Sequence, residues 1–350
     1  MIPAMVMLAA PAGAAVTPYA VTAIISNFNG QAINSGGWVA GYSEDAGGVA
    51  KAGLYNGVSV ISLGTLGGET HQSRAYAVND QGQVAGFSGP ASGTAGRQAF
   101  IHTDGSMTAV SDLTGSYNAA YGINNSGTTA GYYTTSATPV TSRAYSVSGG
   151  VVSYLPAPVS TTAEDINDDG WITGGTGAVR QAYLSDGPGM TYLGTLGGET
   201  SSGNALNTHH QVVGYSTTSG VTTSSTRAFL YEEGIMRNIQ TGTLWETRTG
   251  YAEGINDDGQ VVGRLTGGSG VAFIWDEGVM YDLNSLLDTP ISGTALRAND
   301  INNGGQIIVT YTSGGQTHTA ILSPIPEPGS LSLLAAAGFT AARRRRRRSS

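Results

Sequence analysis

Two turns rich in carboxylate and amide oxygens are the strongest candidates for a metal site in this sequence. They are Asn167-Asp168-Asp169-Gly170 and Asn256-Asp257-Asp258-Gly259. A protein site for Ca²⁺ needs about six to eight oxygen ligands, usually spread over about twelve residues with a distal Glu. Each of these turns offers three polar side chains and then runs into an apolar stretch. The pattern favours a structural turn, with Ca²⁺ binding as the alternative, and the sequence predicts no cofactor and no metal site.

A pair of glutamates could support a different chemistry, the cleavage of a glycan. Glu69 and Glu199 each stand in a Gly-Gly-Glu-Thr segment, and two carboxyl groups about 5 to 9.5 Å apart are typical of glycoside hydrolysis. The sequence has no Cys, no Gly-x-Ser-x-Gly elbow, no His-Glu-x-x-His, no Walker loop and no dinucleotide fingerprint. Its five His have no metal-ligand spacing: His71, His102, His209, His210 and His318. We therefore expect a non-catalytic binding protein, with a glycan hydrolase or lyase as the alternative.

A repeat sets the elements that must position these residues. Seven copies share an aliphatic residue, Asn, a short turn that usually holds Gly, and an apolar stretch that usually closes on a second Gly. The aliphatic residues that open the copies are Ile33, Val78, Ile123, Ile166, Leu206, Ile255 and Ile301. Successive Asn residues are 45, 45, 43, 40, 49 and 46 positions apart. A period in the forties indicates one supersecondary unit that is stacked repeatedly.

The copy over residues 251–283 shows what one unit contains. The four expected strands are Tyr251–Ile255, Gln260–Arg264, Val271–Trp275 and Val279–Leu283. In the first turn, the Asn256 side chain is expected to bond the backbone two residues on, and Gly259 to take a positive φ. Four short strands joined by turns make one blade of a β-propeller.

An Ala followed by an aromatic residue recurs in the third strand of most units. The pairs are Ala99-Phe100, Ala144-Tyr145, Ala182-Tyr183, Ala228-Phe229 and Ala272-Phe273. Small and large side chains at one phase of each blade are typical of a packing layer between neighbouring blades. We expect these aromatics to be core residues rather than ligand contacts.

Strand counting predicts how the ring closes. The seventh copy ends with a strand at Thr319–Leu322 and then meets Pro324, so it lacks a fourth strand, whereas Pro18–Ile25 near the start is a strand without a unit. If that strand completes the last blade, residues 16–324 form seven four-stranded blades without a free edge. We predict this all-β, seven-bladed propeller; the alternatives are six or eight blades, or an open β-solenoid.

Charge argues against nucleic-acid binding. The formal net charge is −8, but six of the sixteen basic residues are Arg343 to Arg348, so the rest of the chain has ten basic and twenty-four acidic side chains. An acidic body does not neutralise phosphates. Residues 1–15 are apolar and end in small residues, like a signal peptide, although the usual initial Lys or Arg is missing.

The repeat resembles the HAF repeat of bacterial extracellular proteins. The resemblance is carried by Ser62–Thr70, Ala77–Gly86 and Arg227–Leu230. The octapeptide Leu63–Thr70 also recurs unchanged at Leu193–Thr200. The His of the family's His-Ala-Phe is replaced here by Gln98, Arg143, Gln181 and Arg227. The resemblance implies an exported, propeller-like repeat domain without an assigned activity.

Residues 325–350 resemble the PEP-CTERM sorting signal. Pro326-Glu327-Pro328 stands at the place of its tripeptide, Leu331–Phe339 is an apolar run, and the basic end is Arg343, Arg344, Arg345, Arg346, Arg347 and Arg348. A short apolar helix followed by Arg residues halts translocation with the charges on the cytoplasmic side. The resemblance implies transient inner-membrane anchoring, cleavage near Pro326 by an exosortase-type enzyme, and release to the cell surface or matrix, where extracellular polysaccharide is the expected partner.

Overall fold

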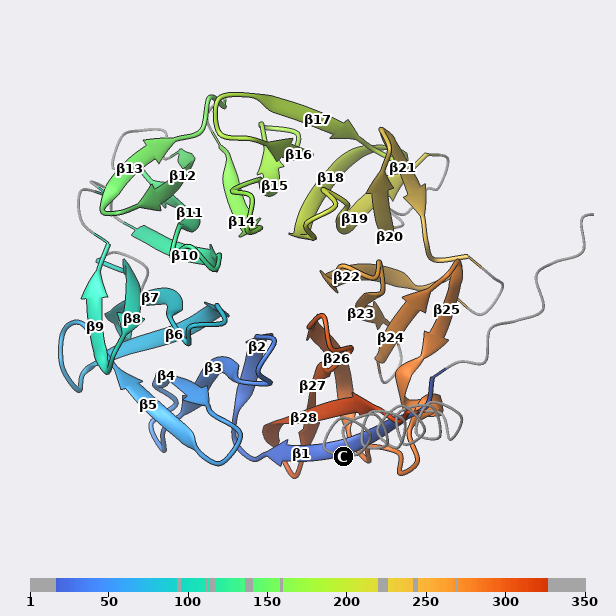
Figure 1. Cartoon of the computed structure of the whole chain (residues 1–350), viewed down its shortest axis with the longest axis horizontal. Helices are drawn as coiled ribbons and strands as arrows, with labels where there is room; N and C mark the ends of the chain where they lie inside the picture. The colour runs from blue at the N-terminus through green and yellow to red at the C-terminus, as the bar shows by residue number, and fades with distance from the viewer. Residues whose placement is uncertain are drawn as a thin grey trace, which may run out of the picture.

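The protein folds into seven four-stranded antiparallel sheets arranged in a ring (Figure 1). The computed structural model describes residues 17–326 except 93–95, 111–112, 114–116, 136–140, 158–159, 220–225, 242–244 and 268–269. Its strands make up a seven-bladed β-propeller, so the prediction from the repeat is confirmed, and the described part adds one 3-10 helix, η1 (Leu283–Leu286). The leader and the tail from Glu327 onward lie outside the described residues. Among the described residues no helix is long and apolar enough to cross a membrane.

Each blade begins at the centre of the ring and ends at its rim (Figure 1). Blade 1 consists of β2 (Asn29–Ile33), β3 (Val39–Glu44), β4 (Ala50–Tyr55) and β5 (Val60–Gly64). Blade 2 consists of β6 (His71–Val78), β7 (Val84–Pro90), β8 (Gln98–Thr103) and β9 (Ser106–Ala109). Blade 3 consists of β10 (Tyr117–Ile123), β11 (Thr129–Thr134), β12 (Ser142–Ser148) and β13 (Val151–Tyr154).

The remaining blades follow the same plan. Blade 4 consists of β14 (Thr162–Ile166), β15 (Ile172–Thr176), β16 (Gln181–Ser185) and β17 (Met190–Gly194). Blade 5 consists of β18 (Gly197–Leu206), β19 (Val212–Thr218), β20 (Thr226–Glu232) and β21 (Ile235–Asn238). Blade 6 consists of β22 (Thr249–Ile255), β23 (Val261–Thr266), β24 (Val271–Asp276) and β25 (Val279–Asp282). Blade 7 consists of β26 (Thr294–Ile301), β27 (Ile307–Ser313), β28 (Gln316–Pro324) and β1 (Tyr19–Ile25).

The last blade is closed by the N-terminal strand, as the strand count predicted. β1 runs antiparallel to β28, from Tyr19 opposite Pro324 to Ile25 opposite Thr319. Tyr19 anchors the strand because its ring is only 2% exposed, whereas Ile24 near the other end of the strand is 57% exposed. Because β1 pairs with β28, neither strand is left without a partner where the ring closes.

A ring of seven hydrogen bonds joins the blades at the turns after the innermost strands. In every blade the turn Asn side chain donates to the main-chain carbonyl of the turn Asn in the next blade, at 2.8 to 3.3 Å. Its oxygen accepts the backbone N–H four residues on within its own turn, at 2.9 or 3.0 Å. We call these residues the Asn ring: Asn34, Asn79, Asn124, Asn167, Asn207, Asn256 and Asn302. The sequence predicted that the Asn oxygen would accept the backbone N–H two residues later. This hydrogen bond occurs in only three turns, those of Asn124, Asn207 and Asn302.

The fourth residue of each turn has a positive φ. Gly82 and Gly259 have φ of 76° and 79°, as the repeat predicted. In the first and last copies this residue is Gly37 or Gly305 rather than Gly36 or Gly304, so those turns are one residue longer than the sequence pattern suggested. In the fifth turn His210 takes the conformation with a φ of 59°.

The third-strand aromatics lie in the core, as expected. Phe100, Tyr145, Tyr183, Phe229 and Phe273 are fully buried. The two tyrosines satisfy their hydroxyls within their own blades, since Tyr145 donates to the carbonyl of Ala119 and Tyr183 to that of Thr162. These rings hold the blades together and are not available to a ligand.

Candidate functional site

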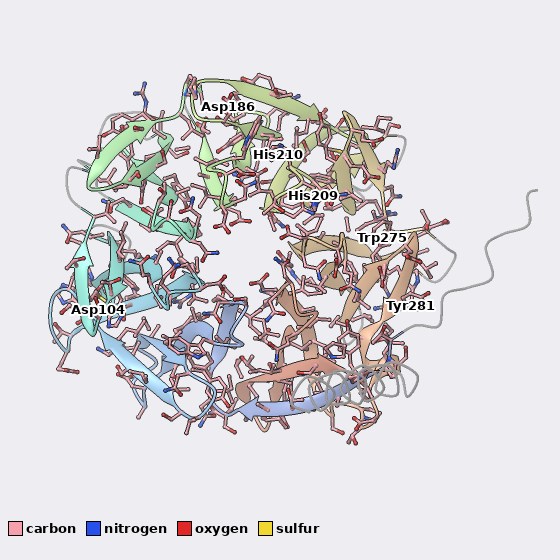
Figure 2. The ribbon with its side chains drawn as sticks, in the orientation of Figure 1. Asp104, Asp186, His209, His210, Trp275 and Tyr281 are labelled. Carbon is pink, nitrogen blue, oxygen red and sulfur yellow. The ribbon has the colours of Figure 1, made fainter. Side chains whose placement is uncertain are left out.

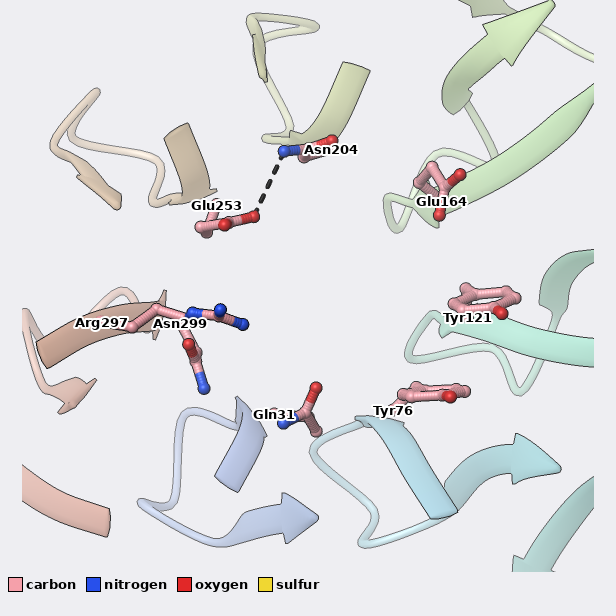
Figure 3. Close-up of a pocket in the computed structure, with 8 residues that line it drawn as sticks. All are labelled: Gln31, Tyr76, Tyr121, Glu164, Asn204, Glu253, Arg297 and Asn299. Atoms are coloured by element: carbon pink, nitrogen blue, oxygen red, sulfur yellow. Dashed lines mark hydrogen bonds between the residues drawn. The ribbon is translucent and has the colours of Figure 1, made fainter. Parts of the chain in front are cut away.

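Seven side chains, one from each blade, line a cavity of about 260 Å³ at the centre of the ring (Figure 3). Each lies three residues before the turn Asn, where the pairing of the two inner strands skips one residue. A β-bulge of this kind re-aims the skipped side chain. We call these residues the bulge ring: Gln31, Tyr76, Tyr121, Glu164, Asn204, Glu253 and Asn299. Arg297 lines the same cavity.

The second Gly of the repeat permits the bulge. In blade 3, a Cβ on Gly131 would lie 2.0 Å from the carbonyl oxygen of Ala119 on the bulged strand. The equivalent glycines of the other blades are equally confined, and they are Gly41, Gly86, Gly174, Gly214 and Gly263. Only Gly fits such a close approach of two backbones. Blade 7 is the exception, with Val309 at this place.

One side of the cavity is aromatic. Tyr121 stacks between Tyr76 and Tyr132, with ring centroids 4.7 and 5.3 Å away and interplanar angles of 11° and 4°. Its hydroxyl lies 2.9 Å from that of Tyr117. Burial raises the pKa of Tyr132 to about 12 and that of Tyr121 still further. Because neighbouring rings cover both faces of Tyr121, it offers the cavity a neutral hydroxyl and a ring edge rather than a flat stacking face.

Two carboxylates, from blades 4 and 6, also line the cavity, and each is held in an ion pair. Glu164 is 2.8 Å from Arg180, and Glu253 is 2.7 Å from Arg264. Asn204, which lies between them in the ring, donates to Glu253 at 3.2 Å (Figure 3). Half-buried pairs such as these fix the orientation of both side chains.

The carboxylates of the channel are therefore not those that the sequence suggested. Glu69 and Glu199 are exposed, and neither lines the cavity. Their octapeptides form the same structural bend twice, because Thr65 donates to the carbonyl of Gly68 and Thr195 to that of Gly198. For this reason the expectation that Glu69 and Glu199 face each other as a carboxylate pair in the channel is wrong.

The acidic turns lie at the other end of the channel and bond to one another. A second cavity of about 210 Å³ there is lined by the turns, including Asp80, Asp168 and Asp257. Each of these carboxylates accepts the backbone N–H of the preceding blade's turn, at 2.8 or 2.9 Å. In the described part of the chain no group of three or more His, Asp or Glu is placed to hold a metal ion. The oxygens of the acidic turns thus have a structural use that needs no Ca²⁺.

Two half-buried carboxyl groups lie beside this end. Asp165 accepts the backbone N–H of Ile166 and, from the next blade, of Leu206. Asp300 does the same with Ile301 and Ile33, so it bridges the last and first blades. Burial raises the pKa of both carboxyls to about 7, although the N–H donors oppose this.

The histidines show no convergent arrangement among the described residues. His209 and His210 share the fifth turn (Figure 2), and the ring of His210 packs 4.4 Å from that of Trp171. Two basic residues at the position of the HAF histidine have a structural role. Arg227 donates to the main-chain carbonyls of Glu246 and Arg248, and Lys51 at the same phase of blade 1 donates to those of Glu69 and His71. Both side chains thus bind the segment that leads to the next blade.

Comparisons with known proteins find the fold alone. No protein-family model and no curated protein matches the chain. A prolyl endopeptidase structure is similar with a TM-score of 0.55 and 11% identity over 87% of this chain and 51% of that one. A puromycin-hydrolysing peptidase of Mycobacterium tuberculosis is similar with a TM-score of 0.50 and 10% identity over 83% and 53%. The chain spans about half the length of these two proteins, and what it shares with them is the β-propeller.

Proposed function

We propose that this chain is an exported cell-surface or matrix protein whose propeller is a non-catalytic module that binds extracellular polysaccharide in its channel. The bulge ring carries this proposal. The seven inner strands keep the turn Asn constant, yet the bulge position holds amides, tyrosines and glutamates. Because the scaffold tolerates such different side chains at one place, we infer that this place serves recognition. Bulges are enriched beside active sites, where they re-aim a side chain.

The chemistry of the ring suits sugar hydroxyls. The side-chain N–H groups of Gln31, Asn204 and Asn299 donate within the protein, so their amide oxygens remain to accept from sugar hydroxyls, and the tyrosines add phenol groups. Sugars present a dense array of hydroxyls that require such mixed partners. A concave site with a few convergent polar groups is the usual form of a small-ligand site.

The alternative is a glycan hydrolase or lyase, and the observation that favours it is the presence of two carboxylates in the cavity. Against it, Glu164 and Glu253 each engage an arginine, and the blade of Asn204 separates them. A pair that cleaves glycosides by acid–base chemistry needs one carboxyl free to donate a proton. We therefore favour binding without cleavage.

One experiment separates these functions. The mature protein is incubated with the exopolysaccharide of its own host, and both retention and polymer length are measured. The variant Gln31→Trp fills the cavity, and Val58→Trp, at an 87% exposed position in a turn near the rim, is its matched control. We expect retention that is lost in Gln31→Trp only, with unchanged polymer length. Shortening of the polymer would instead support the enzyme, and absence of retention would contradict polysaccharide binding and favour a protein partner.

The route to the surface is part of the same proposal. The order of the tripeptide, apolar run and Arg residues at 326–348 supports transient anchoring in the inner membrane and cleavage by an exosortase-type enzyme. Of these residues the structure describes Pro326, which is exposed; Glu327, Pro328 and Arg343 to Arg348 lie outside the described residues. An exposed Pro326, two residues after the end of β28, supports access by a processing enzyme.

A further inference from the structure

Three arginines near the channel have no carboxylate partner among the residues that the structure describes. The guanidinium groups of Arg74, Arg97 and Arg297 make no ion pair, and the Nε atoms of Arg74 and Arg97 are buried without a hydrogen bond. Six other basic side chains of the body do have hydrogen-bond partners, and these are Lys51, Arg180, Arg227, Arg237, Arg248 and Arg264. In a body with an excess of acidic residues, unpaired cations gathered at one place need an explanation.

Arg297 stands in the wall of the cavity itself (Figure 3). Partial burial lowers the pKa of its guanidinium, and the like charge of Arg264 lowers it further. The carboxylate that opposes this effect, Glu253, is already bonded to Arg264 and Asn204. An anion that entered the cavity would therefore meet a cation that the protein leaves without a partner.

Arg74 occupies the same position in its strand as Arg297, five residues before the turn Asn. β6 and β26 lie on either side of β2, so the two arginines flank blade 1. Between them stands Tyr42, whose ring lies 4.4 Å from the Arg74 guanidinium and whose hydroxyl accepts a 2.9 Å bond from Asn29. Stacking on an aromatic ring holds a guanidinium in place while its N–H groups stay free for a ligand.

Arg97 extends this basic region toward blade 3. Its guanidinium lies 4.6 Å from the centre of the Phe87 ring and 5.8 Å from that of Tyr117. The charges of Arg74 and Arg97 both act on Tyr76 of the bulge ring, where they oppose the rise in pKa that burial causes. The three arginines thus form one arc across blades 7, 1 and 2. They lie on the side of the bulge ring that faces away from the turns.

We propose that the glycan bound by the channel is acidic, and that the arc of Arg74, Arg97 and Arg297 binds the carboxylates of its uronic-acid residues. This inference rests on the proposed function and names the class of sugar. Guanidinium groups match carboxylates with two parallel hydrogen bonds. The amides and hydroxyls of the bulge ring then bind the neutral parts of the same chain.

The test compares oligogalacturonate with its methyl ester, in which a methyl group on each carboxyl removes the negative charge. We expect the mature protein to bind oligogalacturonate at least about tenfold more tightly, because charged hydrogen bonds are worth more than neutral ones. Arg297→Gln and Arg74→Gln should each weaken that binding by about tenfold and weaken the binding of the ester by much less. Arg143→Gln is the matched control, since it removes the same charge from an exposed residue at the start of β12.

Two further measurements make the outcome decisive. Arg297→Lys keeps the charge without the two-pronged geometry and should bind with intermediate affinity. Equal affinity for the two probes, or equal losses in Arg297→Gln and Arg143→Gln, would overturn the acidic-glycan inference. Retention of the host's exopolysaccharide is scored in parallel. If the exopolysaccharide is retained but the two probes bind equally well, the proposed function stands and this inference fails. If the exopolysaccharide is not retained, the proposed function itself is contradicted.

Discussion

The side chain of Asn302 donates a 2.8 Å hydrogen bond to the main-chain carbonyl of Asn34, and the two residues belong to the last and first blades. This bond completes the Asn ring, so that every blade is linked to both neighbours in the same way. A closed cycle of this kind couples the blades, because breaking any one link leaves a buried carbonyl and a buried amide without partners.

The Asn ring can be tested with Asn124→Asp. An Asp keeps the oxygen that accepts the Thr128 N–H but replaces the donor to the Asn167 carbonyl with a second oxygen. We expect the free energy of unfolding in urea to fall by about 2 kcal/mol or more. Asn56→Asp is the control, because Asn56 uses only its oxygen, to accept the N–H groups of Val58 and Ser59. Equal effects of the two variants would contradict a structural role of the donor.

The closing strand can be tested with two residues of β1. Tyr19→Ala removes a ring that is 2% exposed and should lower the free energy of unfolding by about 3 kcal/mol or more. Ile24→Ala, at a 57% exposed position in the same strand, should change it by less than about 1 kcal/mol. Denaturant titration measures both, and a similar loss in the two variants would mean that β1 does not anchor blade 7 through Tyr19.

Two turn glycines allow the cost of backbone strain to be measured apart from the cost of a steric contact. A Cβ on Gly259 would lie no closer than 3.7 Å to another side chain, so Gly259→Ala should cost only the strain of a positive φ, about 1 kcal/mol. A Cβ on Gly82 would lie 2.6 Å from the ring of Trp38, so Gly82→Ala should cost more. Adding Trp38→Ala should reduce the excess, and an unchanged excess in this double-mutant cycle would exclude the contact as its cause.

Asp165 and Asp300 predict a pH dependence of stability. Their pKa is about 7 in the folded protein and 3.8 for an ordinary Asp, so the folded state binds more protons between these limits. The free energy of unfolding should therefore fall as pH rises from about 4 to about 7 and then level off. Asp300→Asn should make the decline shallower, whereas Asp104→Asn, at an exposed turn, should leave it as steep. Melting temperatures across the window measure the slope, and an unaltered slope in Asp300→Asn would rule out Asp300 as a source.

Processing of the C-terminus is tested by intact-mass spectrometry of the protein from the extracellular fraction. We expect the mature chain to end near Pro326-Glu327-Pro328 and to lack Arg343 to Arg348. Replacing the tripeptide with Ala residues should retain the precursor in the inner membrane. Recovery of the intact Arg residues outside the cell would refute the proposed route.

The sequence predicted the blades well because their signals are local. Alternating apolar residues, the turn Asn and the turn Gly act within one hairpin, and each copy could be checked against six others. The hydrogen bond from each Asn to the next blade could not be predicted, because it depends on how closely neighbouring turns approach after the ring has closed.

The candidate site was missed for a related reason. Glu164 and Glu253 look like ordinary strand residues in the sequence, and only the bulge turns them into the cavity. The signal was present in the second Gly of the repeat. A side chain on Gly174 or Gly263 would collide with the backbone of the bulged strand beside it, so the bulge requires Gly there. Reading that Gly as the sign of a bulge would have pointed to the residues that line the channel.

The bulge ring also fixes the orientation of a bound ligand. The scaffold has nearly sevenfold symmetry, but the tyrosines of blades 2 and 3 and the carboxylates of blades 4 and 6 break that symmetry inside the channel. A ligand therefore meets four types of side chain in an order that no rotation repeats, and it cannot rotate into an equivalent pose. Since each neighbour comes from a separate copy of the same unit, specificity can change through one blade at a time while the propeller around it stays the same.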